Sequence, residues 1–313
     1  MTIITKRIVL KGISMALVAL MGALPGHAQS DGGRTAADFL LIGVGARAAG
    51  MGGAYTGVAE GANASYWNPA GLANTEYSEV SFGHVLWYQD MTVNNFAGQF
   101  QIGEKAAFGA SMMFLNYGAI DGYDANGAVT GSISAYDWAG GLSFAYRLND
   151  DLSMGVTGKY INQKLDDLSG SSFAVDAGLS YALDRVTFAA VASNFGSEIK
   201  FESVSEKLPS TVRFAVAAYP FGESILASAE IEKRMYGGMV VRNGFEFGFD
   251  KQYFLRAGYN YYPDEQDRTF GTGFAFGAGV KLNNLQFDYA YTLKEKYASE
   301  DLHRFSMSFA FGQ

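Results

Sequence analysis

The sequence contains no cysteine and only three histidines among its 313 residues. The absence of cysteine excludes disulfide frameworks, thiolate zinc sites, thiol nucleophiles and a lipidated N-terminal cysteine. Basic residues are also scarce, with 23 lysines and arginines against 31 aspartates and glutamates, and this balance argues against nucleic acid as a partner. The chain is nevertheless 49% hydrophobic and 15% aromatic, which excludes a wholly disordered protein.

The N-terminal segment has the composition of a secretory signal peptide. Lys6, Arg7 and Lys11 form a positive start, residues 12–24 are an apolar core, and small residues precede the position after Ala28. A proline and a glycine interrupt the apolar stretch too early for a membrane-anchoring helix of about 20 residues. We therefore expect residues 1–28 to be removed on export. No later stretch is long and apolar enough for a transmembrane helix, so the exported chain is either soluble or a β-barrel.

Large apolar residues alternate with small or polar ones along most of the remaining chain. Near the C-terminus, for example, Phe305, Met307 and Phe309 alternate with Arg304, Ser306 and Ser308. A period of two is typical of strands with one apolar and one polar face. The pattern predicts fourteen strands, at residues 77–88, 92–102, 105–117, 132–148, 152–164, 171–182, 186–194, 210–219, 225–233, 239–249, 253–262, 270–282, 285–294 and 303–311.

The predicted strands are joined alternately by tight turns, such as Asn283-Asn284, and by longer polar loops, such as residues 118–131 and 196–209. This alternation and an even number of strands are typical of bacterial outer-membrane barrels. An exported soluble β-sandwich is the alternative. Its strands usually have about 5–6 residues, whereas the predicted strands are about twice as long. In lipid, only a closed barrel pairs every strand edge. We therefore predict an all-β fold, a fourteen-stranded antiparallel transmembrane β-barrel at residues 76–313.

Residues 29–75, between the signal peptide and the first strand, are rich in glycine and alanine. A phosphate-binding loop is a poor interpretation, because the glycine spacing matches neither nucleotide fingerprint and no Gly-Lys-Ser/Thr follows. Small residues allow close backbone approach and positive φ. We expect this segment to form a plug inside the barrel, facing the glycine stripe of the predicted strand 270–282. The candidate residues of the plug and of the turn that joins it to the barrel are Arg47, Gly50, Gly52, Gly53, Asn68 and Pro69.

Charged side chains occur at alternate strand positions that should face the barrel interior, and their positive and negative charges nearly balance. Unpaired charges in a confined interior are costly, so we expect these groups to pair with one another or with the plug. Arg47 should seek a wall carboxylate such as Asp176, Glu246 or Asp288. The charges either make a plugged barrel rigid or line a solute pathway. The candidate lumen charges are Asp137, Arg147, Lys159, Asp176, Arg213, Glu230, Arg242, Glu246, Arg256, Lys281, Asp288 and Arg304.

No catalytic, cofactor or metal site is predicted. A lipase or protease barrel would need a serine or aspartate pair with a histidine base. After export only His84 and His303 remain, on the first and last predicted strands, which closure makes neighbours. Neither histidine has an evident nucleophile as a partner. We therefore expect a protein that is not an enzyme.

Two stretches resemble the opening signature of the PorV/PorQ family, which is related to the FadL long-chain fatty-acid transporters. Residues 39–55 read FLLIGVGARAAGMGGAY, and residues 63–72 read NASYWNPAGL. The resemblance implies a FadL-like barrel in the outer membrane of Bacteroidetes or neighbouring phyla. The Asn-Pro-Ala element, here Asn68-Pro69-Ala70, is shared with FadL proteins, in which it closes the N-terminal hatch and leads into strand one.

The resemblance implies two different functions. PorV-like members serve the type IX secretion system by carrying or docking cargo with a C-terminal β-domain, and PorQ-like members act in surface attachment. FadL-type relatives instead admit hydrophobic small molecules. The chain is shorter than the secretion shuttle and has compact outer loops, and it lacks the long apolar outer loops of FadL. Expected partners are outer-membrane lipid and either type IX components and cargo C-terminal domains or a hydrophobic small molecule.

Overall fold

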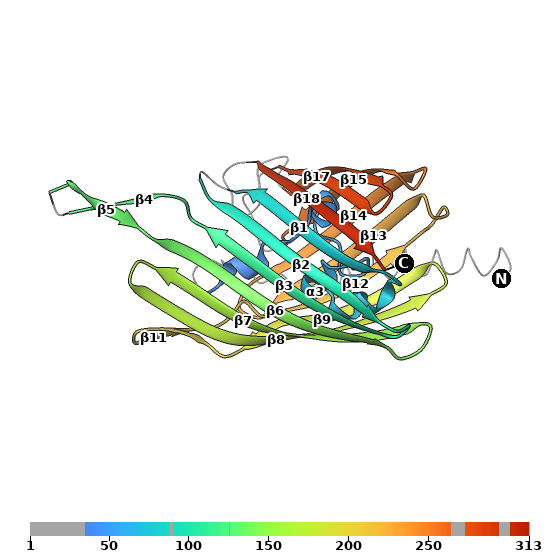
Figure 1. Ribbon diagram of the computed structural model, residues 1–313, viewed down its shortest axis with the longest axis horizontal. Coiled ribbons are helices and arrows are strands. Elements are labelled where there is room, and N and C mark those ends of the chain that lie inside the picture. Colours follow the sequence, from blue (N-terminus) through green and yellow to red (C-terminus); the bar gives the residue numbers. More distant parts are fainter. Residues whose placement is uncertain (1–34, 88–89, 125, 264–272, 294–300, 313) are drawn as a thin grey trace.

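The computed structural model describes residues 35–87, 90–124, 126–263, 273–293 and 301–312. The predicted signal peptide, residues 1–28, lies outside the described residues. Fourteen strands close into an antiparallel barrel, as predicted (Figure 1). They are β1 Ser78–Leu86, β2 Thr92–Ile102, β3 Ala106–Asn116, β6 Ala135–Arg147, β7 Leu152–Leu165, β8 Leu168–Leu183, β9 Val186–Gly196, β12 Thr211–Ala218, β13 Ile225–Arg234, β14 Met239–Phe249, β15 Tyr253–Tyr261, β16 Phe274–Leu282, β17 Leu285–Thr292 and β18 Leu302–Phe311.

The first and last strands complete the barrel. β1 pairs with β18 from Ser78 opposite Phe311 to Leu86 opposite His303, and β1 pairs with β2 on its other edge. Each strand of the barrel therefore has two neighbours, and its backbone N–H and C=O groups have partners on both sides. This pairing is what a backbone needs in hydrocarbon, where water is not available as a hydrogen-bond partner.

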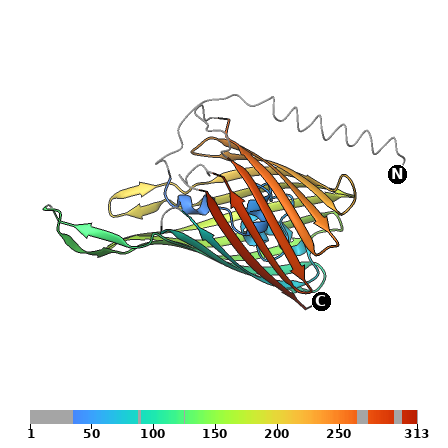
Figure 2. The same cartoon turned by 90° about the horizontal axis from the view of Figure 1, so that it is seen from above.

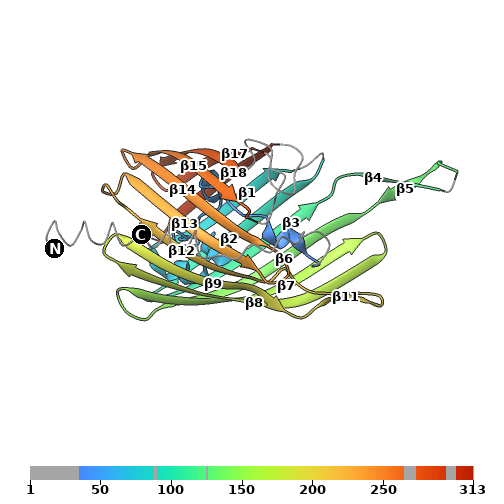
Figure 3. The ribbon, with the colours of Figure 1, turned by 180° about the vertical axis from the view of Figure 1, so that it is seen from behind.

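The two ends of the barrel differ. We call one end the turn end, because it carries the tight turns, and β1 begins there. We call the other end the ribbon end, because it carries two hairpins, which the sequence pattern predicted as loops. β4 (Ile120–Tyr123) pairs with β5 (Val129–Ile133), and β10 (Ile199–Phe201) pairs with β11 (Val204–Glu206). The β4–β5 ribbon projects far beyond the barrel wall (Figures 1 and 3).

Two predicted strands also differ from the observed ones at this end. β7 and β8 are separated by only Asp166 and Asp167, and Asp166 adopts a positive φ of 53°. The predicted strand 152–164 ended before the end of β7, and the predicted strand 171–182 began after the start of β8, because the two aspartates and the serines that follow read as a polar loop. The predicted strand 270–282 is observed from Phe274, after Gly273 in a turn, and residues 270–272 lie outside the described part of the chain.

Large apolar side chains cover the outer face of the barrel. Phe96, Phe245 and Phe305 are among the many rings that remain exposed on this face. Rings on neighbouring strands also contact one another, as Trp138, Tyr160 and Phe173 do with centroid distances of 5.4 Å and 5.1 Å. An apolar outer face with aromatic clusters suits a barrel surrounded by lipid.

The inner segment, residues 35–77, occupies the interior (Figure 2). It contains the 3-10 helices η1 (Asp38–Leu41) and η2 (Pro69–Asn74) and the short helices α2 (Ala46–Gly50) and α3 (Ala64–Trp67). At the ribbon end, the Ala36 amide donates to the Lys207 carbonyl at 2.9 Å. At the turn end, Arg147 Nε donates to the Ala73 carbonyl at 3.1 Å. The segment thus runs along the barrel from the ribbon end to the turn end, where β1 begins.

No helix within the described residues has the length and apolar character needed to cross a membrane.

Candidate functional site

The backbone of the inner segment packs directly on glycines of the wall. A Cβ atom on Gly50 would lie 2.9 Å from the Gly277 Cα atom, in the predicted glycine stripe. Gly52 has a φ of +64°, and a Cβ atom there would lie 2.8 Å from the Tyr259 nitrogen. Gly53 has a φ of +74°, and its missing Cβ leaves room for the Arg242 side chain. A side chain at Gly50 or Gly52 would therefore collide with the backbone of β15 or β16.

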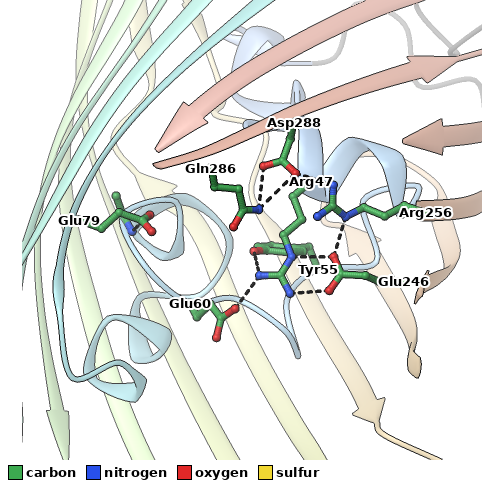
Figure 4. A network of polar contacts seen from close by, with 9 residues as sticks. Arg47, Tyr55, Glu60, Glu79, Glu246, Arg256, Gln286 and Asp288 are labelled. Carbon is green, nitrogen blue, oxygen red and sulfur yellow. Dashed lines mark hydrogen bonds and ion pairs between the residues drawn. The ribbon is translucent and has the colours of Figure 1, made fainter. Parts of the chain in front are cut away.

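Arg47 of α2 is the centre of an ion-paired group that we call the central cluster: Arg47, Glu60, Glu246, Arg256 and Asp288 (Figure 4). Arg47 Nε and Nη2 donate to the two carboxylate oxygens of Glu246, each at 2.9 Å. Arg47 Nη1 donates to Glu60 Oε1 at 2.6 Å. A bidentate arginine–carboxylate pair fixes orientation as well as distance. It therefore connects the inner segment to β14 in one defined position.

Arg256 of β15 extends the central cluster along the wall. Its Nε donates to Glu246 Oε2 and its Nη1 donates to Asp288 Oδ1, both at 2.6 Å. Gln286 Nε2 donates to the same aspartate at 2.9 Å. Of the three carboxylates considered for Arg47, Glu246 is therefore in direct contact, and Asp288 is linked through Arg256.

A second group of charged residues lies nearer the ribbon end. We call it the ribbon-end cluster, and it consists of Arg213, Glu230, Glu232, Arg234 and Arg242. Arg242 Nη1 donates to Glu230 Oε1 and Glu232 Oε2, each at 3.0 Å. Arg234 Nε donates to Glu232 Oε1 at 3.0 Å. Glu230 Oε2 also accepts the Thr56 amide of the inner segment at 3.0 Å. The sequence analysis did not select Glu232 and Arg234, although both share the inward parity of Glu230.

Arg213 has contacts of another kind. Its Nη2 donates to Ser193 Oγ at 2.8 Å, and its guanidinium lies 5.6 Å from the centre of the Trp67 ring. Its Nε is buried without a hydrogen-bond partner among the described residues. Arg213 therefore contacts the inner segment through a ring rather than through a carboxylate.

Asp176 and Asp137 lie apart from both clusters. Asp176 pairs with Lys159 at 2.6 Å and accepts the Asn194 amide at 2.8 Å, so its contacts stay within the wall. Asp137 accepts hydrogen bonds from Gln163 and Tyr117, each at 2.8 Å. Burial, and then the neighbouring Asp137 carboxylate, raise the pKa of the Tyr117 hydroxyl. Tyr117 therefore keeps its proton and donates it to this hydrogen bond.

Asn68 and Pro69 join the inner segment to the wall near the turn end. Asn68 Oδ1 accepts the Ala70 amide at 3.1 Å and so caps η2, in which Pro69 occupies the first turn. Asn68 Nδ2 donates to the carbonyls of Thr56 and Leu179, each at 3.2 Å. The side chain of Asn68 thus connects η2 with another part of the inner segment and with β8.

The interior also contains a cavity of about 240 Å³ at the ribbon end, which we call the ribbon-end recess. It lies between η1 and the ends of several strands. Its lining combines arginines with aromatic and aliphatic side chains, and Asp38 at its edge is exposed. Its larger aromatic and basic lining residues are Phe39, Trp67, Trp87, Tyr262, Arg234, Arg242 and Arg304.

Two histidines, His84 and His303, lie within the described residues, on the outer face near the ribbon end. His84 Nδ1 lies 2.8 Å from Asn94 Oδ1, and His303 Nδ1 lies 2.8 Å from the Tyr289 hydroxyl. Leu86, rather than His84, is the residue opposite His303. Within the described residues, no group of histidines and carboxylates is arranged to hold a metal ion.

A closed fourteen-stranded barrel with an apolar outer face and an ion-paired, occupied interior defines a β-barrel of the outer-membrane type. A family model described as type IX secretion system protein PorV matches residues 27–210, which is more than half of the chain. The protein therefore belongs to the PorV family. A comparison with curated proteins found no match.

Solved structures with this fold include channels for hydrocarbons. The Pseudomonas putida toluene transporter TodX has 14% identity and a TM-score of 0.62, with 86% of this chain and 98% of that chain covered. The monoaromatic hydrocarbon channel CymD has 15% identity and a TM-score of 0.62, with 87% and 99% covered. A Pseudomonas aeruginosa FadL homologue has 12% identity and a TM-score of 0.55, with 86% and 98% covered. At these sequence identities, the similarity to the solved structures shows the fold alone.

Proposed function

We propose that this protein is a docking component of type IX secretion in the bacterial outer membrane. Membership of the PorV family supports the link to this secretion system. The observation that carries the docking role is the occupied interior, in which Arg47 binds Glu246 through two hydrogen bonds. An interior held by such pairs favours a rigid body that offers surfaces to partners. In this proposal residues 29–75 act as a plug, and the protein has no catalytic activity.

The proposal includes an orientation in the membrane. Outer-membrane barrels usually have short turns on the periplasmic side and longer extensions on the outside. The turn end is then periplasmic, and the ribbon end with β4–β5 and β10–β11 faces the cell surface. Partners and cargo C-terminal domains would meet the protein at the ribbon end.

Deletion of the gene tests the secretion role. We expect secreted proteins that carry the C-terminal sorting domain to accumulate in the periplasm, and the wild-type gene to restore their export. Total outer-membrane protein serves as the control for general damage to the envelope. Normal secretion in the deletion strain would contradict the proposal.

FadL-like uptake of a hydrophobic small molecule is the second candidate function. The ribbon-end recess favours it, because aromatic and aliphatic side chains form much of a 240 Å³ cavity. Uptake would require the inner segment to move, since it occupies the interior toward the turn end. Slower growth of the deletion strain on an apolar nutrient, together with normal secretion, would support uptake instead of docking.

A further inference from the structure

The turn between β13 and β14, residues 235–238, lies at the ribbon end, and two exposed lysines contact it. Lys207, which follows β11, places its Nζ atom 4.7 Å from the centre of the Tyr236 ring. Lys233 of β13 donates from Nζ to the Gly237 carbonyl at 2.8 Å. The two ammonium groups are therefore held by neighbouring residues of one turn. We call Lys207, Lys233 and Tyr236 the rim site.

The two lysines of the rim site have no acidic partner. Within the described residues, no ion pair joins Lys207 or Lys233 to a carboxylate. Glu232, next to Lys233 in the sequence, faces the interior and pairs with two arginines there. An ammonium group has three N–H donors, and Lys233 uses one of them for the Gly237 carbonyl. Both ammonium groups can therefore bind an anion that approaches from outside the barrel.

The rim site lies at the edge of an apolar strip on the outer face. Lys233 is opposite Val212 on β12 and Met239 on β14. Two positions back along β13, Ile231 is opposite Phe214, whose side chain is 58% exposed. Alternation places these residues on the same outward face as Lys233. A lysine at such an edge lays its stem on apolar surface and keeps its ammonium group at the polar boundary, where tyrosine is also common.

This arrangement suits an anion that is attached to hydrocarbon. Ammonium groups bind phosphate as compact point charges. The strip that contains Phe214 and Ile231 offers an apolar surface along which acyl chains can lie. A lipid with a phosphate in its headgroup provides the anion and the chains in one molecule. In the proposed orientation of the barrel, such a lipid belongs to the outer leaflet of the outer membrane.

We propose that the rim site binds the phosphate of an outer-leaflet lipid, with Lys207 and Lys233 against the phosphate and the acyl chains along Phe214 and Ile231. The ring of Tyr236 holds the Lys207 ammonium group beside that of Lys233. This inference goes beyond the docking function, because it assigns a lipid partner. It takes only the orientation of the barrel from the proposed function.

Native mass spectrometry of the purified mature protein in detergent measures lipid binding directly. The probes are lipid A with two phosphates and the same lipid A after removal of both phosphates, so the acyl chains are identical. We expect the phosphorylated lipid to bind at least about tenfold more tightly, and this preference to weaken as salt is added. Inorganic phosphate at the same concentration should not displace the lipid, because it has no acyl chains.

Two double variants with the same change in charge locate the site. Lys207→Gln combined with Lys233→Gln should remove the preference for the phosphorylated lipid. Lys105→Gln combined with Lys251→Gln removes two exposed cations at the turn end and should leave the preference unchanged. Far-UV circular dichroism shows whether each variant remains folded. The lipid pair tests the proposal on the unsubstituted protein even where a variant fails to fold.

Equal affinity for the two lipids would overturn the proposal, and so would a preference that survives in the rim-site variant. An equal loss in both double variants would also overturn it, because the effect would then follow net charge. Displacement of the lipid by inorganic phosphate at equal concentration would show a site for a free anion instead.

The assay also separates a lipid from an acidic partner protein. Impaired secretion in a rim-site variant that binds both lipids like the unsubstituted protein would overturn the proposal, because the lysines would then contact a protein. Lipid binding in detergent is independent of the gene deletion. A phosphate preference that depends on Lys207 and Lys233, together with normal secretion in the deletion strain, would support the rim site and contradict the docking function.

Discussion

The two ion-paired clusters of the interior connect different parts of the molecule. In the central cluster, a side chain of the inner segment binds the wall, because Arg47 forms an ion pair with Glu246 of β14, and a second one with Glu60 of its own segment. In the ribbon-end cluster, the pairs lie between wall residues, and the inner segment contributes a backbone amide and a ring. The formal charges also differ, since the central cluster has one more carboxylate than arginine. The central cluster thus positions the inner segment, whereas the ribbon-end cluster links neighbouring strands of the wall beside the ribbon-end recess.

Substitution of one shared glutamate in each cluster is the strongest test of this difference. Glu246→Gln leaves Arg47 and Arg256 without their common carboxylate, and Glu232→Gln does the same for Arg234 and Arg242. Each change should cost about 3–5 kcal/mol in the free energy of unfolding, because it removes the charge that two buried arginines share. Denaturant unfolding in detergent measures the loss.

The comparison predicts that only Glu246→Gln releases the inner segment. Limited proteolysis followed by N-terminal sequencing should show new cleavage between residues 35 and 77 in this variant and none in Glu232→Gln. Glu223→Gln is the matched control, because the Glu223–Lys251 pair is almost fully exposed and should contribute little. Equal cleavage in both cluster variants would show that the clusters do not have separate roles.

Gly52→Ala tests the close packing beside the central cluster. The alanine would have a strained φ of +64° and a Cβ atom 2.8 Å from the Tyr259 nitrogen. We expect a loss of about 1–3 kcal/mol in the free energy of unfolding. Gly103→Ala is the control, since Gly103 has a φ of +62° but nothing lies within 4 Å of its missing Cβ. If both variants lose the same stability, backbone strain rather than contact with the wall explains the glycine.

Asn68→Ala tests the connection between the inner segment and the turn end. It removes the cap of η2 and leaves the carbonyls of Thr56 and Leu179 without this donor. The expected cost is about 0.5–2 kcal/mol, as for the loss of other N-caps. Thermal unfolding in detergent measures it. Asn68→Asp keeps the oxygen that caps η2 but not the amide donor, so an intermediate loss would separate the two contributions.

The smallest effect is expected outside the barrel, at the tip of the β4–β5 ribbon. Asp124 Oδ1 accepts the amides of Ala128 and Asn126, and these hydrogen bonds lower the pKa of the Asp124 carboxyl. Because the folded pKa is depressed, the stabilisation is present above the unfolded pKa and is lost as the pH falls through the folded value. Amide hydrogen exchange at Gly127 and Ala128, corrected for its intrinsic pH dependence, should show weaker protection below about pH 4. In Asp124→Asn this extra pH dependence should disappear, and its persistence would contradict the assignment to this carboxyl.

Much of the barrel could be predicted from the sequence, because alternate residues of a strand face opposite sides of the sheet and this pattern can be read from neighbouring residues. A period of two assigned Glu246, Arg256 and Asp288 to the inner face, where Glu246 and Arg256 are buried and Asp288 is half-buried. The β4–β5 ribbon was predicted as a loop because its strands are short and lie among glycines and polar residues. Glu232 and Arg234 were missed even though the parity of Glu230 extends to both of them.

The sequence by itself determined the strands, their inward and outward faces and the number needed to close a barrel, because alternation acts between neighbouring residues. It also indicated that the glycine-rich segment could pack tightly. Only the tertiary structure decided that Arg47 binds Glu246, which lies 199 positions away, and that the Arg213 guanidinium lies over the Trp67 ring. Such partners depend on the path of the inner segment through the barrel, and that path is set by contacts between residues far apart in the chain.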